Sequence, residues 1–594
     1  MSYKIIDSLH QEIGKTIASE RFLNTMDGFW FALKPNVIIN SFDFVTVDTL
    51  FNSKSIGIIQ ELQAVTAAEH DYYNYYLSDS HTISSTKEQL KQKGKEKEDE
   101  EDEEEKSEQL SKRQLNSLIL VKVAIMANTG VKAEGYEESK SVNFPVEVGK
   151  TVRFANEEEI IFALGIPQME NPIPAGIIET TNGLEVPITL DVSYLAGADT
   201  AHVNASGISG NRKSSYILFL LQSSYQTLKK MNQNVALIIF NTKEQDLLYI
   251  DQKEKYTKKR TERLFDVLDL DIEPFENVTY FLPRGKDGKP NSIHVPKNYR
   301  TYSYELKDVY DRLELLFSEP YDLHHDFLSI MNYIYESWPL KSNIGNKDIS
   351  TWTDLSEFKE YPETIVSNKS SLLYFLGRLQ RFRKSPMFID KKKTSTYLSN
   401  EIKKIKAGEV FVIDVATISS FEEQAFVVGD VMKSIDEMYS SRYSNLDDDN
   451  TSNNTNIDSN KNNNVQNDQK KLHYILVFVD EINRFIPKSQ NGKMNSVSEQ
   501  IMRTVSAGRT RGTILFSAQQ FKSATDYRLQ ENTDLHITAK LGLSELSTEP
   551  YSMLDESTKK NIVRLNKGEL VMVHPAFRHP IKIGFPKATF KEPY

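Results

Sequence analysis

Four short and almost continuous apolar runs in the C-terminal two-thirds of the chain constrain the fold most strongly. Strands that are buried on both faces have this composition, whereas half-exposed strands alternate apolar and polar residues. Segments with helical periodicity lie between the runs. Together they predict a parallel, doubly wound α/β sheet that binds its ligand at the carboxyl ends of the strands. The apolar runs are Val235–Phe240, Val410–Val415, Ile475–Val479 and Thr513–Ala518, and the helical segments include Lys213–Met231, Glu422–Met438 and Ser496–Val505.

The N-terminal part of the chain has a different pattern. After a short opening helix, it contains segments rich in Val, Ile and Phe that alternate partly and lack helical periodicity. Several short strands within about 150 residues predict a small β-barrel or sandwich. We therefore expect a β-rich domain over residues 1–165 and an α/β domain over 166–594. The strand candidates are Asn36–Asp48, Ser55–Val65, Ser117–Ala127 and Asn143–Phe154.

Three segments are expected to be insertions. Residues about 84–112 include an unbroken acidic run, Glu98–Glu105, and residues about 444–470 contain ten asparagines. Neither segment has enough apolar surface to fold, so both are expected to be disordered, although the acidic run could also compete for a basic partner. Residues about 251–405 are mostly helical in pattern and too long for a loop, which predicts a helical subdomain.

A glycine-rich segment, Ala205–Ser215, has the residues that a phosphate-binding loop needs, although Arg212 stands where such loops usually have a glycine. Glycines let backbone amides approach an anion, Lys213 would reach the β- and γ-phosphates, and the Ser214 hydroxyl would ligate Mg²⁺. The helix that follows would point its amino end at the phosphates. A plain glycine-rich turn between a strand and a helix is the alternative. The expected nucleotide-binding residues are Gly207, Gly210, Asn211, Arg212, Lys213, Ser214 and Ser215.

An acidic pair, Asp480 and Glu481, ends the apolar strand that begins at Tyr474. Two carboxylates at the end of a buried strand are costly unless they serve a metal or a water molecule. Asp480 is therefore predicted to hold Mg²⁺ together with Ser214, and Glu481 to activate the attacking water. The alternative is a strand that simply ends in charged loop residues.

A glutamine and a pair of arginines are further catalytic candidates. Gln519 ends another buried strand, where an amide could sense a γ-phosphate. Just before that strand, Gly508–Gly512 presents Arg509 and Arg511 on an expected glycine-flanked turn. One of these two arginines could stabilise phosphate charge in the site of a neighbouring subunit, and a solvated surface loop is the alternative.

In the order of these motifs the chain resembles the HerA/FtsK superfamily of ring-forming ATPases, and HerA most closely. The β-rich start, the phosphate loop after Thr200–Asn204, Val479–Pro487, Gly508–Gln519, and the closing segments Gly568–Val571 and Pro580–Ile583 carry the resemblance. The resemblance implies a HAS-barrel domain, a RecA-like P-loop core and a homo-hexamer, with Arg509 as the arginine that reaches the neighbouring site. It also implies ATP and Mg²⁺ as cofactors, double-stranded DNA in a central pore, and a NurA-type nuclease as a possible partner.

Composition and charge limit other function classes. The net charge of −11 argues against a protein that coats nucleic acid with its outer surface, but not against binding in an internal channel. The chain has no cysteine, which excludes disulfides, thiolate metal sites and cysteine nucleophiles. It shows no signal pattern and no apolar run of about 20 residues, so we expect a cytoplasmic protein without a membrane segment.

The sequence therefore predicts an ATP-dependent DNA translocase or helicase that acts in DNA end processing, repair or defence. A nucleotide-binding regulatory or scaffold ATPase with weak hydrolysis is the first alternative, and a conjugation-type coupling ATPase is the second. A basic stretch, Arg378–Lys384, could contact DNA phosphates, but a solvated helix face is an equally good interpretation.

Overall fold

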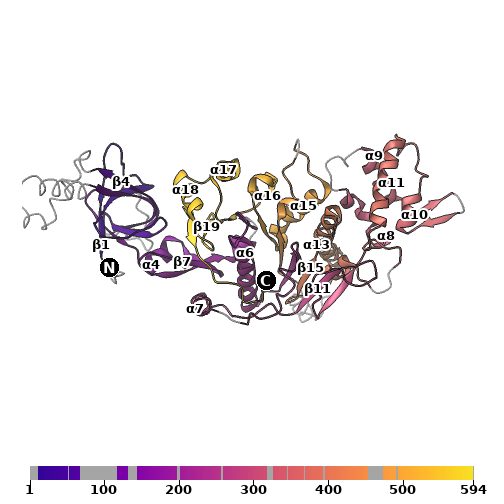
Figure 1. Cartoon of the computed structure of the whole chain (residues 1–594), viewed down its shortest axis with the longest axis horizontal. Coiled ribbons are helices and arrows are strands. Elements are labelled where there is room, and N and C mark those ends of the chain that lie inside the picture. The colour runs from indigo at the N-terminus through magenta and orange to yellow at the C-terminus, as the bar shows by residue number, and fades with distance from the viewer. Residues whose placement is uncertain are drawn as a thin grey trace, which may run out of the picture.

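The computed structural model describes residues 11–50, 53–66, 117–130, 144–196, 201–255, 258–317, 325–343, 346–366, 368–391, 395–451, 472–489 and 492–592. They form a β-barrel, a large sheet flanked by helices, and a helical region. The barrel and the helices α9–α11 lie at opposite ends of an elongated molecule, with the sheet between them (Figure 1). The acidic segment about 84–112 and residues 452–470 of the Asn-rich segment lie outside the described residues.

Six antiparallel strands close the N-terminal barrel in the order β1-β2-β5-β4-β3-β6. Alternate residues of β2 and of the middle of β5, such as Phe29, Phe31, Val121 and Val123, pack into one buried cluster, as the two-residue period of a strand requires. The predicted β-barrel is thus confirmed. Its strands are β1 (Glu12–Ile17), β2 (Gly28–Leu33), β3 (Phe44–Asp48), β4 (Lys54–Thr66), β5 (Ser117–Asn128) and β6 (Thr151–Phe154).

A short connection joins the barrel to the main sheet. It consists of α4 (Glu157–Ala163), a 3-10 turn at Ile166–Gln168, the antiparallel hairpin β7 (Pro172–Glu179) and β8 (Glu185–Asp191), and α5 (Val192–Ala196). Helix α4 begins with a capping box between Asn156 and Glu159. The domain boundary near residue 165 stays a prediction.

Ten strands form the main sheet in the order β12-β11-β15-β10-β16-β17-β9-β18-β19-β20. All neighbours from β12 to β18 are parallel, and β19 and β20 are antiparallel. The α/β fold with a mainly parallel sheet is therefore confirmed. The strands are β9 (Val203–Ser206), β10 (Val235–Asn241), β11 (Val278–Pro283), β12 (Tyr299–Tyr302), β15 (Val410–Asp414), β16 (Tyr474–Asp480), β17 (Thr513–Gln519), β18 (Leu535–Thr538), β19 (Leu570–Val573) and β20 (Ile581–Ile583).

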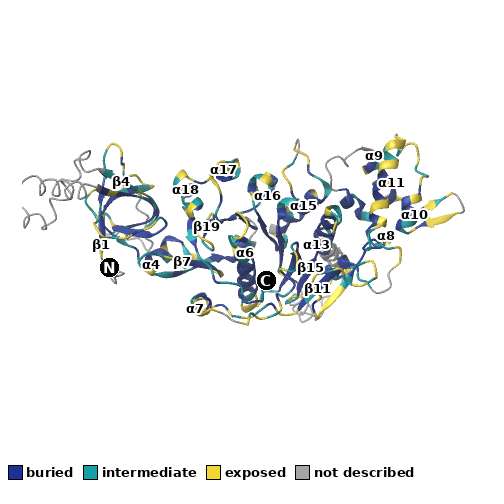
Figure 2. Ribbon diagram, viewed as in Figure 1, coloured by how far each residue is buried: buried dark blue, intermediate teal, exposed yellow. Residues whose placement is uncertain are grey.

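Both faces of the sheet are buried. In β10, Leu237 and Ile239 pack into one apolar cluster together with α6 (Lys213–Lys230). Ala236, Ile238 and Phe240 point to the other face and pack with α13 (Phe421–Thr451) and α15 (Ser496–Arg511). Figure 2 shows this central block as largely buried. Helices on both faces explain why these strands are almost entirely apolar.

The region predicted as a helical insertion, about 251–405, is only partly helical. It also supplies β11 and β12 to one edge of the sheet and a small hairpin, β13 (Leu340–Ser342) and β14 (Lys347–Ile349). Within this region, Leu306–Leu316 is not one helix but α8 (Leu306–Val309) followed by a 3-10 segment with a non-helical Arg312. Its other helices are α7 (Lys259–Val267), α9 (His325–Glu336), α10 (Trp352–Glu357), α11 (Lys369–Arg383) and α12 (Leu398–Ile402).

The remaining helices lie in the second half of the chain. Helix α13 (Phe421–Thr451) is longer than expected and continues into the start of the Asn-rich segment. The others are α15 (Ser496–Arg511), α16 (Tyr527–Glu531), α17 (Leu543–Leu546) and α18 (Glu556–Arg564). No helix in the described part of the chain is long and apolar enough to cross a membrane.

Candidate functional site

The predicted phosphate loop and acidic pair meet at the carboxyl edge of the sheet. Strand β9 runs into the glycine-rich loop, which leads directly into α6. Strand β16 ends at Asp480, and β17 lies between β9 and β16. Because these strands are parallel, the segments that follow them emerge on the same side of the sheet.

Four side chains come together at this edge. Ser214 Oγ donates a hydrogen bond to Asp480 Oδ2 at 3.1 Å, and Lys213 Nζ lies 3.9 Å from Glu481 Oε1. Lys213, Asp480 and Glu481 are buried. Burial lowers the pKa of Lys213, and the two nearby carboxylates oppose this shift only in part.

A second cation, Lys243, which the sequence analysis missed, completes the cluster. Lys243 Nζ donates to Asp480 Oδ2 at 3.0 Å and to Glu481 Oε1 at 2.7 Å. Burial alone would lower the pKa of Lys243, but the attraction of both carboxylates outweighs it and raises the pKa. Lys243 follows the end of β10, which is the parallel neighbour of β16, so its place next to a buried strand was the available signal.

The backbone of the loop is shaped for close approach. Gly207 has φ of +153°, and a Cβ there would lie 2.6 Å from the Cβ of Ala539, so only glycine fits. Arg212 has φ of +62°, a left-handed conformation that favours glycine. Its guanidinium group lies against Gly568: a Cβ at position 568 would be only 3.3 Å from Arg212 Nη1. The arginine therefore fits at this position by extending away from the loop backbone.

Two cavities flank these residues. One of about 420 Å³ is lined by Gly210, Arg212, Lys213, Ser214 and Ser215, together with Lys243, Lys567 and Lys587. The other, of about 230 Å³, is lined by Ser214, Ser215, Lys243 and Asp480, together with Asn241 and Thr242. The first cavity is rich in cations and suits an anion. Asn211 lines neither cavity, and its amide donates to the Ile208 carbonyl at 3.4 Å.

The residues present fit a magnesium ion that is bound together with a nucleotide. Mg²⁺ prefers hard oxygen ligands and commonly takes one or two from protein and the rest from phosphates and water. Ser214 Oγ and Asp480 Oδ2 offer two such oxygens on a shared cavity wall. The buried Thr242 hydroxyl on the same wall has no hydrogen-bond partner among the described residues. No group of three or more acidic or histidine side chains in the described ranges forms a self-sufficient metal site.

The predicted sensor, Gln519, does not reach into these cavities. Its side chain is buried, and its amide forms a reciprocal pair with Asn204 at 2.8 and 2.9 Å. The next residue, Gln520, places Nε2 3.5 Å from Glu481 Oε1. Adjacent residues along a strand point to opposite faces of the sheet. Gln519 accordingly pairs with Asn204 of β9, whereas Gln520 faces the acidic pair.

The expected arginine turn at Gly508–Gly512 is a helix. Helix α15 continues to Arg511 and ends at Gly512, whose φ is +76°, which corrects the predicted turn. The Arg509 backbone lies in this helix, at the amino edge of β17, and its side chain lies outside the described part of the structure. Arg511 Nη1 lies 3.5 Å from Asp436 Oδ1 of the same chain.

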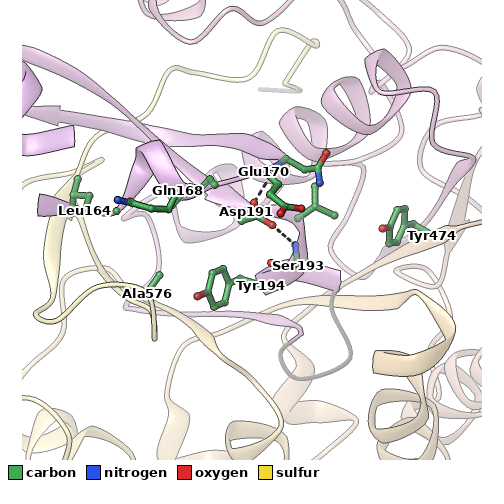
Figure 3. A pocket seen from close by; sticks show the side chains of 12 residues that line it. Leu164, Gln168, Glu170, Asp191, Ser193, Tyr194, Tyr474 and Ala576 are labelled. Carbon is green, nitrogen blue, oxygen red and sulfur yellow. Dashed lines mark hydrogen bonds between the residues drawn. The ribbon is translucent and has the colours of Figure 1, made fainter. Parts of the chain in front are cut away.

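A third cavity, of about 760 Å³, lies near the start of β16 and away from the acidic pair (Figure 3). Asp191 on its wall accepts hydrogen bonds from the backbone amides of Asn171 and Ser193, at 3.0 and 2.8 Å. Burial alone would raise the pKa of Asp191, but these hydrogen bonds outweigh it and lower the pKa. The carboxylate therefore holds the loops around it, and we assign no chemistry to this cavity.

No protein-family model and no curated protein matches the sequence. Among solved structures, the chain is similar to the bacterial conjugative coupling protein TrwB in its unbound form, with a TM-score of 0.40 and 12% identity over 68% of this chain and 89% of that chain. It is also similar to the genome-packaging NTPase of Sulfolobus turreted icosahedral virus 2 in complex with ATPγS, with a TM-score of 0.21 and 11% identity over 32% and 72%. Likenesses at these scores do not decide the function, which has to come from the site.

Proposed function

We propose that this chain is a Mg²⁺-dependent P-loop ATPase of the HerA/FtsK superfamily, with a RecA-like domain, that moves double-stranded DNA. The observation that carries this is the convergence of Lys213 and Ser214 with Asp480 and Glu481 on one cavity edge. Ser214 and Asp480 are 266 positions apart in the sequence, yet their side chains share a hydrogen bond. A plain glycine-rich turn would not require an acidic strand end beside it.

Each residue then has a role in hydrolysis. Lys213 and the loop amides bind the β- and γ-phosphates, and Ser214 and Asp480 hold Mg²⁺, which neutralises phosphate charge. Glu481 has φ of +51°, an uncommon conformation that turns it toward the two lysines. From there Glu481 accepts a proton from the attacking water, and Gln520 takes the sensing role expected of Gln519.

The DNA-dependent part is tested by steady-state ATPase assays with and without a long linear duplex. A motor is expected to turn over faster with duplex, and to displace a third strand from a triplex in the presence of ATP. Hydrolysis that is unaffected by DNA, together with no displacement, would leave an ATPase without translocation.

Under the same proposal, six copies form a ring with DNA in its central pore and a NurA-type nuclease as a partner. The ring acts in the cytoplasm, in DNA end processing, repair or defence. Arg509 lies at the opposite edge of the sheet from its own acidic pair, so it would serve the site of a neighbouring subunit. Arg509→Ala is expected to bind ATP normally and hydrolyse it slowly. Mixing it with Lys213→Ala is then expected to restore some activity, and no recovery despite subunit exchange would refute a finger acting between subunits.

A second candidate function is a nucleotide-binding regulatory or scaffold ATPase with weak hydrolysis. The ion pairs from Lys243 to both Asp480 and Glu481 favour it, because they occupy the carboxylates that turnover needs. This candidate predicts tight ATP binding, slow hydrolysis and no response to DNA.

A further inference from the structure

A basic cavity of about 410 Å³ lies beside the carboxyl ends of β11 and β15. Four cationic side chains line it: Arg284, Lys286, Arg381 and Lys384. They come from the loop after β11 and from the end of α11, which are far apart in the sequence. Among the described residues, none lines both this cavity and either of the two nucleotide cavities.

These four cations differ from their neighbours in having no acidic partner. None of them forms an ion pair within the described part of the chain. Nearby basic residues are all paired: Arg378 with Glu422 at 2.9 Å, Lys289 with Asp287 at 3.7 Å and Arg383 with Glu357 at 3.3 Å. The same two segments thus neutralise some cations and leave the cavity-lining ones uncompensated.

The basic stretch Arg378–Lys384 is divided by the structure. Arg378 is buried in its ion pair, and Arg383 is paired outside the cavity, whereas Arg381 and Lys384 line the cavity and are exposed. A solvated helix face therefore does not describe all of this stretch.

The single acidic side chain on the cavity wall is already engaged. Glu423 accepts a hydrogen bond from Ser385 Oγ at 2.8 Å, and burial raises its pKa, which disfavours the charged form. Glu423 also lies in the first turn of the 31-residue helix α13, whose amino end contributes positive potential. Arg284 is held in place by its hydrogen bond to the Pro386 carbonyl at 3.1 Å.

We propose that this cavity is a second anion site, which binds a phosphate group through Arg284, Lys286, Arg381 and Lys384. Guanidinium groups and lysines converging without acidic partners suit a phosphate oxygen cluster, since Arg binds it bidentately and Lys as a point charge. The phosphate would come from a nucleic-acid backbone or from a small phosphate compound. The cavity would bind it whether or not the chain hydrolyses ATP.

The test compares two triple variants of the full chain that lose the same charge. Lys286→Gln/Arg381→Gln/Lys384→Gln removes three cavity cations that make no ion pair. Lys289→Gln/Arg300→Gln/Arg383→Gln is the matched control, since each of those residues pairs with an acid elsewhere on the surface. Binding of a 30-base-pair duplex is measured over a salt series, and binding of pyrophosphate is measured in a Lys213→Ala background that weakens the phosphate loop.

If the phosphate belongs to nucleic acid, the cavity variant is expected to lose about tenfold or more in duplex affinity. The slope of log affinity against log salt concentration should become shallower by about 0.9 for each phosphate contact that is lost. If it belongs to a small compound, the cavity variant should keep duplex affinity and lose pyrophosphate binding. The proposal is overturned if the cavity variant equals wild type with both probes, or if the control loses as much. DNA-free ATPase activity should be unchanged in the cavity variant, which separates this site from the proposed catalytic one.

Discussion

The two basic regions at the carboxyl edge of the sheet differ in how their cations are neutralised. Around the phosphate loop, Lys213 and Lys243 stand next to two buried carboxylates. Beside β11 and β15, Arg381 and Lys384 have no acidic partner among the described residues. The charges of these two lysines and two carboxylates cancel, whereas Arg212, Lys567 and Lys587 leave the adjoining cavity cationic. The first region therefore suits an anion that is accompanied by a metal ion. The second needs only an anion.

A buried lysine behind the phosphate loop shows a third solution. Lys522 Nζ lies 3.0 Å from His536 Nδ1 and 5.3 Å from the centre of the Tyr551 ring. Burial lowers the pKa of Lys522 to about 7, and Glu545 offsets this only weakly. Tyr551 in turn donates to Ser206, the residue before Gly207, at 3.0 Å. A lysine in this protein can thus be paired with an acid, exposed to solvent, or buried so that it loses its proton more easily than an ordinary lysine.

The largest expected effect on nucleotide binding comes from removing Lys213, the paired lysine of the loop. Lys213→Ala should weaken Mg·ATP binding by about 10- to 100-fold, because a hydrogen bond to a charged group contributes about 1.5–3 kcal/mol. Titration with a fluorescent ATP analogue measures the affinity. Lys229→Ala, on the exposed side of the same helix, is the control and should bind as wild type does. Equal affinities in the two variants would remove Lys213 from the phosphate site.

The buried lysine should make stability depend on pH. The folded pKa of Lys522 is about 7 and the ordinary value is 10.5, so between these pH values the unfolded chain holds more protons. Stability therefore rises with pH in this range, by at most about 1.4 kcal/mol per pH unit. Lys522→Met should remove this part of the slope in urea unfolding at pH 7, 8 and 9. The exposed Lys253→Met control should keep it, and parallel slopes in all three proteins would refute a neutral Lys522.

A smaller effect is expected for the lysine that bridges the acidic pair. Lys243→Met removes a positive charge that competes with Mg²⁺ for Asp480. The Mg²⁺ concentration for half-maximal ATPase activity should therefore fall by about two- to fivefold, as for a partly exposed ion pair. A rise in that concentration would mean that Lys243 assists the bound nucleotide instead.

Much of the fold could be predicted because strands that are buried on both faces appear in the sequence as nearly continuous apolar runs. The strands β10, β15, β16 and β17 lie within one or two residues of their predicted apolar runs. Short edge strands such as β12 show no such run, since Tyr299–Tyr302 is largely exposed and polar. The sequence analysis therefore missed β11 and β12, which lie within the predicted helical insertion.

The candidate site divides in a similar way. Lys213, Ser214, Asp480 and Glu481 come together as expected because parallel strands deliver their ends to one edge. The sequence does not show whether Gln519 or Gln520 faces the acidic pair. A shift of one residue along a strand moves the side chain to the opposite face of the sheet. Lys243 was missed although it follows a buried strand, because its contact with the acidic pair depends on the shape of the loop after β10. Asn241 holds that loop by hydrogen bonds to the backbone of Glu244 and Leu247.

The water-activating role of Glu481 is tested most directly by single-turnover hydrolysis of Mg·ATP by Glu481→Gln. The amide keeps the shape of the side chain but cannot accept the proton, and a general base contributes about 10²- to 10⁴-fold. The variant should bind Mg·ATP within a few-fold of wild type and hydrolyse it at least about 100-fold more slowly. Hydrolysis within a few-fold of the wild-type rate would contradict the assignment of Glu481 as the general base.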